Sequence, residues 1–248
     1  MIYATIGLFV GVIMGITGAG GAMISIPLFI NLTGTSLKEA TVLSLVAVVF
    51  GTAVNLIGRV FEVNKKIAIS MSVAGAISNY YSLPLKEIVS EFVIAALLTV
   101  IGIYSIWSVW DRKSNSHTLK EEKRVLSKAL IAGAFLGVIT TLTGLGGGVI
   151  LVPILINVFG KTYEEALPTS LGTILLISLT AFIFQFKTAF FLISFTQLAL
   201  LAAGALIAYG LLKVLLKKIT EAKLLLIRRT VFTTVTIYSV VSVIIKVI

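Results

Sequence analysis

The chain has 248 residues, of which 58% are hydrophobic and only 12% are charged, and its mean hydropathy is +1.11. Soluble domains carry about 25% charged residues, so this composition indicates an integral membrane protein surrounded by the lipid bilayer. The net charge of +10 does not indicate nucleic acid as a partner, because the basic residues fall in loops between apolar segments. The absence of cysteine excludes disulfides, thiolate metal sites and thiol nucleophiles.

The first two predicted elements are separated by a cluster of glycines. An apolar stretch at 2–17 runs into the Gly-Ala-Gly-Gly sequence of 18–21, and a second apolar stretch follows at 22–33. Clustered glycines end a helix because they adopt backbone angles that other residues avoid. The second stretch spans roughly 18 Å as a helix, which is too short for a hydrocarbon core of about 30 Å. Either one broken helix or a helical hairpin is therefore expected here.

Three longer helices are predicted in the rest of the first half. Ser36 and Glu39 have the spacing of a capping box, in which a hydroxyl and a carboxylate satisfy the free N–H groups at a helix start. A helix therefore begins next to this pair. The predicted membrane helices cover about 37–58, 66–84 and 88–110.

The sequence contains an internal repeat. Residues 7–45 align with 133–171 at a constant offset of 126 without a gap, and 18 of 39 positions are identical. Membrane composition alone would match aliphatic residues, but the matches here include several other residue types. The matching pairs include Gly7/Gly133, Gly11/Gly137, Thr17/Thr143, Gly18/Gly144, Gly20/Gly146, Gly21/Gly147, Pro27/Pro153, Asn31/Asn157, Gly34/Gly160, Glu39/Glu165 and Ser44/Ser170.

The second half follows the same order of elements. Apolar stretches at 129–143 and 149–159 flank a second glycine cluster, and Thr162 and Glu165 form the second expected capping box. The remaining predicted helices cover about 163–186, 188–212 and 224–247. We therefore expect a first repeat at 1–110, a linker loop at 111–128 and a second repeat at 129–248. The single histidine, His117, is expected to be a solvated residue of the linker.

The distribution of basic residues distinguishes the broken-helix and hairpin models. Cytoplasmic loops of membrane proteins carry an excess of Lys and Arg. The hairpin model places 16 of the 20 basic residues on one side, whereas a single crossing divides them 11 to 9. With hairpins, each half makes an odd number of crossings, so the halves have opposite orientations. The predicted fold is an all-α polytopic membrane protein with two inverted-topology repeats, each a Gly-broken helical hairpin plus three transmembrane helices.

The glycine breaks are the predicted substrate site. Irregular backbone at membrane depth is tolerated only where protein buries it or where it lines a watery cavity. The stretches after the glycines also begin helices, whose free N–H groups and partial positive charge favour anions. Nearby hydroxyls would add donors. The predicted substrate-binding residues are Thr17, Gly18, Ala19, Gly20, Gly21, Ser44, Thr143, Gly144, Gly146, Gly147, Gly148 and Ser170.

Structural roles compete with these functional ones. The glycines of the breaks could serve only as a hinge, and Ser44 and Ser170 could bond the carbonyl of the preceding turn. Glu39 and Glu165 are the candidate coupling residues, with the capping box as the alternative. No catalytic residue, metal site or cofactor is predicted, and the lack of acids in the central segments argues against an enzyme. Other expected structural roles are helix packing by Gly7, Gly11, Gly15, Gly133 and Gly137, and helix capping by Asn31 and Asn157.

The paired Gly-x-Gly-Gly segments, each followed by an apolar run and a proline, resemble the sulfite exporter TauE/SafE family. The residues that carry this resemblance are Gly11, Gly18, Ala19, Gly20, Gly21 and Pro27, and Gly137, Gly144, Leu145, Gly146, Gly147, Gly148 and Pro153. The resemblance covers essentially the whole chain and implies transport of small sulfur-containing anions such as sulfite and organosulfonates. One departure is Ala22, which stands where the second copy has Gly148.

The expected function is that of a secondary transporter or facilitator of a small anion, working by alternating access between the halves. The resemblance implies a sulfur oxyanion or an organosulfonate as substrate. The alternative is a non-transporting membrane assembly or sensor subunit. We expect a multi-pass protein of the inner (plasma) membrane, with both termini outside and the 111–128 loop in the cytoplasm. The anion, the coupling ion, the direction of transport and any homo-oligomer remain open.

Overall fold

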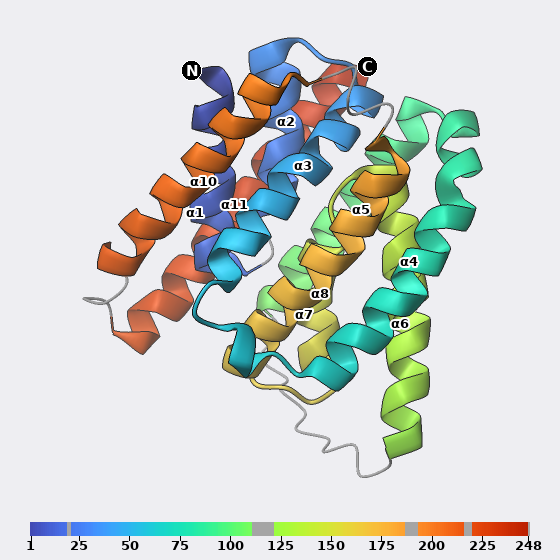
Figure 1. Cartoon of the computed structure of the whole chain (residues 1–248), viewed down its shortest axis with the longest axis vertical. Helices are drawn as coiled ribbons and strands as arrows, with labels where there is room; N and C mark the ends of the chain where they lie inside the picture. Colours follow the sequence, from blue (N-terminus) through green and yellow to red (C-terminus); the bar gives the residue numbers. More distant parts are fainter. Residues whose placement is uncertain (19–20, 111–121, 187–192, 216–219, 248) are drawn as a thin grey trace.

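The computed structural model describes residues 1–18, 21–110, 122–186, 193–215 and 220–247, and the regular elements in this part of the chain are all helices (Figure 1). The first half contains α1 (Ile2–Thr17), α2 (Gly21–Thr33), α3 (Leu37–Leu56), the short 3₁₀ helix η1 (Val60–Glu62), α4 (Lys65–Ile88) and α5 (Glu91–Trp110). The second half contains α6 (Glu122–Thr143), α7 (Gly148–Asn157), α8 (Tyr163–Phe184), α10 (Phe195–Leu215) and α11 (Glu221–Val247).

Six of the described helices are long and apolar enough to cross a membrane, and the chain is therefore a multi-pass membrane protein. These helices are α3, α5, α6, α8, α10 and α11. The helices α1, α2 and α7 are apolar but shorter. The helix α4 matches the span predicted at 66–84 in position but is not among the six, because its sequence mixes serines, an asparagine and charged residues with apolar ones.

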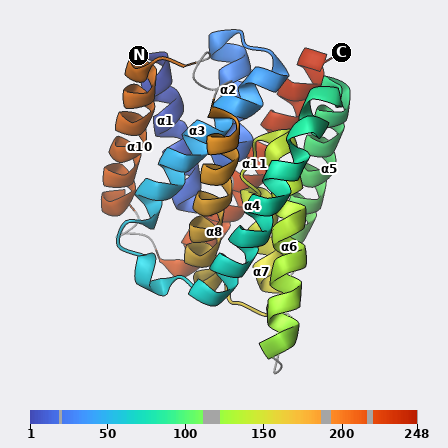
Figure 2. The same cartoon turned by 45° about the vertical axis from the view of Figure 1, so that its right-hand side comes forward.

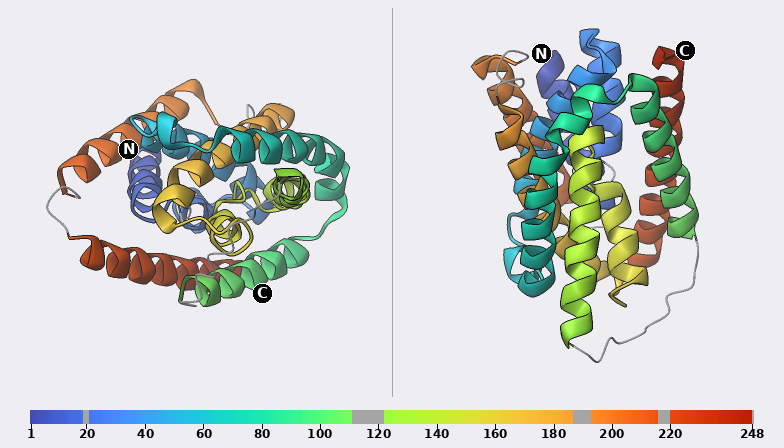
Figure 3. Two further views of the ribbon diagram at one scale, coloured as in Figure 1. Left: turned by 90° about the horizontal axis from the view of Figure 1, so that it is seen from below. Right: turned by 90° about the vertical axis from the view of Figure 1, so that its right-hand side faces the viewer.

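The helix pairs α1–α2 and α6–α7 enter the bundle from opposite ends. Both termini lie at one end of the molecule, and the connection from α2 to α3 lies at this same end (Figure 1). The connection from α7 to α8 lies at the opposite end, where η1 is also found (Figure 1). Thus α1 runs inward and α2 returns, while α6 and α7 do the same from the other end (Figure 3).

Both predicted capping boxes are present and fix where the central helices begin. The Ser36 hydroxyl accepts a hydrogen bond from the Glu39 N–H, and the Glu39 carboxylate accepts one from the Ser36 N–H at 2.9 Å. Thr162 and Glu165 make the same pair of bonds at the start of α8. The two central helices, α3 and α8, therefore start at equivalent positions and pack against each other.

Glycines bring α1 against α10 and α6 against α4 (Figure 2). A Cβ atom on Gly11 would lie 2.7 Å from the Cβ of Ala208, and one on Gly137 would lie 2.9 Å from the Cα of Gly75. Such distances are too short for any side chain, so the predicted helix-packing role of these glycines is confirmed. Each inward-running helix is thus locked to a helix of the other half.

The helices α5 and α11 form an outer layer on one side of the bundle (Figure 3). Asn31 of α2 donates hydrogen bonds to Tyr238 and Ser242 of α11, and Asn157 of α7 donates to Ser108 of α5. The expected capping role of both asparagines is therefore wrong, since their amides bind the outer layer instead. The helix ends are made by Gly34 and Gly160 with positive φ.

Candidate functional site

The second glycine cluster forms a buried left-handed turn between α6 and α7. Gly144, Gly146 and Gly147 have φ of +69°, +63° and +69°. All three are buried, and a Cβ on Gly146 would meet the Ser178 hydroxyl and lie 2.9 Å from Val48 Cγ1. The turn therefore requires glycine for backbone conformation and also for space against α3 and α8.

This turn leaves polar groups without protein partners. The N–H groups of Gly146, Gly147 and Val149 have no acceptor in the part of the chain that the structure describes. The Ser178 hydroxyl, which faces Gly146, is fully buried and also has no partner there. Buried amides and hydroxyls are almost always hydrogen-bonded, because an unmet donor costs about 1–3 kcal/mol. Free N–H groups at a helix start carry partial positive charge, which favours anions.

The two halves exchange hydrogen bonds at their glycine turns. The Ser44 hydroxyl donates to the Gly144 carbonyl at 2.7 Å, and the Ser170 hydroxyl donates to the Gly18 carbonyl at 3.3 Å. Each serine also lies 2.8 Å from the carbonyl three residues earlier in its own helix. The predicted proximity of Ser44 and Ser170 to the turns is present, but their hydroxyls support the turn backbone.

Thr17 and Thr143, the last residues of α1 and α6, direct their hydroxyls back into their own helices. Thr17 donates to the Ile13 carbonyl and Thr143 to the Ile139 carbonyl, both at 2.7 Å. The Thr143 oxygen also accepts from the Leu145 N–H at 3.4 Å. These threonines stabilise the helix ends that precede the turns.

The first glycine turn is described at its two ends. Gly18 has φ of +74° and ends α1, and Gly21 begins α2. A Cβ on Gly18 would lie 2.8 Å from Leu167 Cγ, so α8 packs directly against this turn. Ala19 and Gly20, which the sequence also assigns to the site, lie outside the described residues. In the second turn, Gly148 is the first residue of α7.

Glu39 and Glu165 lie away from the turns, at the starts of α3 and α8. Their carboxylates are engaged in the capping boxes, and Glu165 also forms an ion pair with Lys161 at 3.6 Å. The carboxylates of both candidate coupling residues thus make helix-capping hydrogen bonds.

The end of α1 is bound by residues of the second half. Arg228 of α11 donates its Nε–H to the Ile16 carbonyl at 3.1 Å and lies over the Tyr163 ring, 4.9 Å from the ring centroid. Tyr163 in turn donates to the Thr17 carbonyl at 2.7 Å. These contacts satisfy carbonyls that the end of a helix leaves free.

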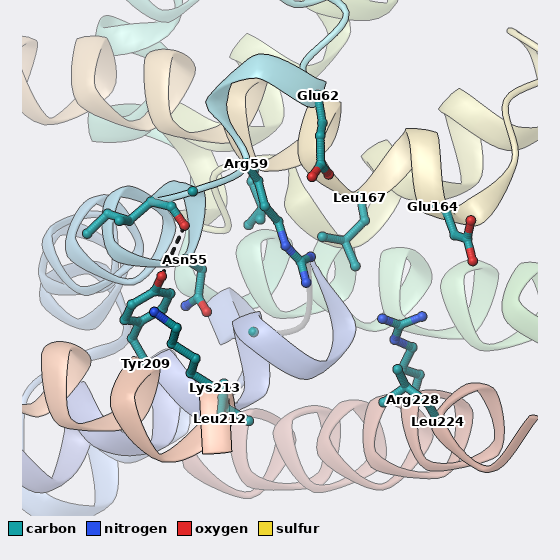
Figure 4. A pocket seen from close by; sticks show the side chains of 14 residues that line it. Asn55, Arg59, Glu62, Glu164, Leu167, Tyr209, Leu212, Lys213, Leu224 and Arg228 are labelled. Atoms are coloured by element: carbon teal, nitrogen blue, oxygen red, sulfur yellow. Dashed lines mark hydrogen bonds between the residues drawn. The ribbon is translucent and has the colours of Figure 1, made fainter. Parts of the chain in front are cut away.

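A cavity of about 710 Å³ opens beside this helix end, and Glu62 of η1 is part of its lining (Figure 4). Its walls come from α1, α3, α8, α10 and α11 and from the segment around η1. The charged residues of its lining are Arg59, Glu62, Glu164, Lys213 and Arg228.

Sequence reasoning missed Ser178 and Arg228. Ser178 lies two helical turns beyond Ser170 on α8, but a serine in an apolar helix usually bonds its own backbone and gives no signal. The charge distribution treats Arg228 only as one of the basic loop residues. Its position within the long apolar helix α11 is the sequence signal that could have identified it as a candidate functional residue.

The family model described as "Sulfite exporter TauE/SafE" matches residues 3–242, nearly the whole chain. No curated protein and no solved structure matches. The match covers both glycine turns and the helices that enclose them. The chain belongs to the sulfite exporter TauE/SafE family.

Proposed function

We propose that this protein is a secondary transporter or facilitator that carries a small sulfur oxyanion or organosulfonate across the plasma membrane. Membership of the sulfite exporter family supports a membrane transporter of sulfur anions. The six long apolar helices are consistent with a multi-pass protein. On this proposal the protein is not an enzyme and works without a cofactor.

The second glycine turn is the observation that carries the proposal. Three amides of this buried turn, and the Ser178 hydroxyl beside it, have no acceptor among the described residues. A sulfite or sulfonate group offers several oxygen acceptors, so it can satisfy such donors together. The binding site needs no basic side chain, because the start of α7 supplies the positive potential. The first turn would act as its counterpart.

We further propose that the halves are inverted repeats that exchange access to the turns. The reciprocal bonds from Ser44 and Ser170 support this, because each half holds the turn of the other. At the repeat offset, the cavity residue Gly15 corresponds to Thr141, and the stretch after α3 that carries Arg59 corresponds to the stretch after α8 that carries Gln185. There, Thr141 donates to Asn79 at 3.1 Å and Lys86 donates to Gln185 at 2.6 Å. Hydrogen bonds therefore join α4 to α6 and to the residue after α8 at the repeat-related position, whereas a cavity lies beside α1.

Efflux is the proposed direction. The excess of basic residues assigns the 111–128 loop to the cytoplasm and both termini to the outside. An inside-negative potential then favours anion exit by about 2.3 kcal/mol per charge per 100 mV. Glu39 and Glu165 act as helix caps on this account, so efflux needs no coupled proton.

Flux through purified protein in liposomes tests the proposal. We expect sulfite, thiosulfate or a sulfonate to pass through the native protein, and Ser178→Ala to slow that flux about tenfold, as expected for loss of a buried hydrogen bond to a charged group. Ser72→Ala is the matched control, because Ser72 on α4 is also buried and without a partner in the described chain. Equal flux by both variants would refute the site at the second turn. No flux of any of these anions through the native protein would favour the assembly or sensor alternative.

A further inference from the structure

The cavity beside α1 differs from the glycine turns in the kind of groups that line it. Arg59 and Arg228 extend their guanidinium groups into it from opposite walls, and Lys213 lies beside Tyr209 (Figure 4). Three basic side chains face two acidic ones, Glu62 and Glu164, so the lining carries one net positive charge. A partly enclosed space between apolar helices strengthens such a field relative to open water.

Two of the basic side chains are free to bind a ligand. Arg59 and Lys213 form no ion pair within the described residues. Arg59 comes from the segment after α3 and Lys213 from the last turn of α10, so they approach from different elements. Guanidinium groups bind planar or tetrahedral oxyanions through paired N–H donors, and an ammonium group adds a mobile charge.

The third basic side chain, Arg228, lines the cavity and also binds the end of α1, which leads into the first glycine turn. Arg228 binds the Ile16 carbonyl through Nε, which leaves its terminal NH₂ groups directed into the cavity (Figure 4). Leu167 lines the cavity and also packs against Gly18. Leu167 therefore contacts both the cavity and the described end of the first turn.

We propose that this cavity is a vestibule that binds the substrate anion, an oxyanion of sulfur, before it reaches the first glycine turn. The vestibule comprises Arg59, Lys213 and Arg228 with their apolar surroundings, at the end of the molecule where η1 lies. This inference rests on the proposed transport function, because it assigns the side from which the anion enters. It predicts that anions gather on the linker side of the protein.

Charge removal at the vestibule tests this in transport. Arg59→Gln and Lys213→Gln should each raise the KM for the anion about three- to tenfold when it is supplied from the vestibule side, with little change in kcat. Supply from the other side should show no such change. Lys65→Gln is the matched control, since Lys65 is exposed at the same end and does not line the cavity. An identical KM in all three variants would overturn the proposal.

A second measurement is independent of transport. The chain contains no cysteine, so a single cysteine can be introduced without further changes. Leu224→Cys reports on the vestibule and Phe61→Cys, at an exposed site on η1, reports on the open surface of the same end. Each is labelled with an anionic and with a cationic methanethiosulfonate reagent of similar size.

The ratio of anionic to cationic labelling rates should be about tenfold higher at Leu224→Cys than at Phe61→Cys at low salt. Lys213→Gln or Arg59→Gln, added to Leu224→Cys, should lower the ratio, and high salt should do the same. Equal ratios at the two sites would overturn the vestibule even if the protein transports anions. A raised ratio without any flux would instead retain the vestibule and contradict the proposed function.

Discussion

At the scale of single residues, the candidate site consists of glycines in the left-handed region and of nearby hydroxyl groups. Most of these hydroxyls are hydrogen-bonded within the protein, and one has no partner among the described residues. Ser44, Ser170, Thr17 and Thr143 all bond to backbone carbonyls, so they build the turns. Ser178 is different, because its buried hydroxyl has no partner among the described residues. The unpaired group, and not the one nearest the motif, is the better candidate for contact with substrate.

Gly146→Ala should abolish transport while the protein still inserts into the membrane. An alanine at this position would have to adopt the left-handed conformation of the turn, which costs about 1–2 kcal/mol, and its Cβ would also meet Ser178 and Val48. Flux and membrane insertion are measured on the same preparation.

Two other glycines separate these causes. Gly34→Ala has the same strain, with φ of +70°, but an open surrounding, and Gly210→Ala has neither strain nor contact. We expect Gly34→Ala to lower stability modestly without loss of flux, and Gly210→Ala to behave as the native protein. If Gly146→Ala transports as well as Gly34→Ala, the space at the second turn is not part of the site.

At the scale of elements, the sequence predicted the helices and their breaks better than the contacts between them. Capping boxes and glycine clusters are local signals, so the starts of α3 and α8 and the two breaks could be predicted from spacing alone. The hydrogen bonds from Ser44 and Ser170 to the turn of the opposite half could not be predicted, because they depend on how α3 packs against α8. The predicted capping role of the asparagines of α2 and α7 was wrong for the same reason, since their hydrogen-bond partners lie on α11 and α5.

The capping boxes give a prediction for the two glutamates. Glu39→Gln and Glu165→Gln should keep both transport and its pH profile, because glutamine accepts the same hydrogen bond from the cap residue's N–H. The pH dependence of flux in liposomes is the measurement. A flattened profile in either variant would show instead that the carboxylate carries a coupled proton.

At the scale of the whole molecule, two broken hairpins enter from opposite ends and α3 meets α8 at the centre (Figure 3). The charge count across loops predicts opposite orientations for the two halves, and the cavity at one end depends on the packing of five helices, which no local sequence signal gives. The bonds of Thr141 and Lys86 join α4 to α6 and to the residue after α8 at the repeat-related position.

Single cysteines test the orientation in intact cells. Ser90→Cys lies in the connection between α4 and α5 at the end with the termini, and Phe61→Cys lies on η1 at the opposite end. A membrane-impermeant maleimide should label Ser90→Cys from outside and Phe61→Cys only after permeabilisation. The reverse pattern would place the vestibule outside and would favour uptake.

The central claim is that this chain moves a sulfur oxyanion through its glycine turns. Counterflow of radiolabelled sulfite in liposomes measures this most directly, because unlabelled sulfite trapped inside should draw labelled sulfite in only if a carrier exchanges them. We predict accumulation with the native protein and with Gly210→Ala, and none with Gly146→Ala. Accumulation that is equal in Gly146→Ala, or absent from the native protein for sulfite, thiosulfate and sulfonates alike, would contradict the account.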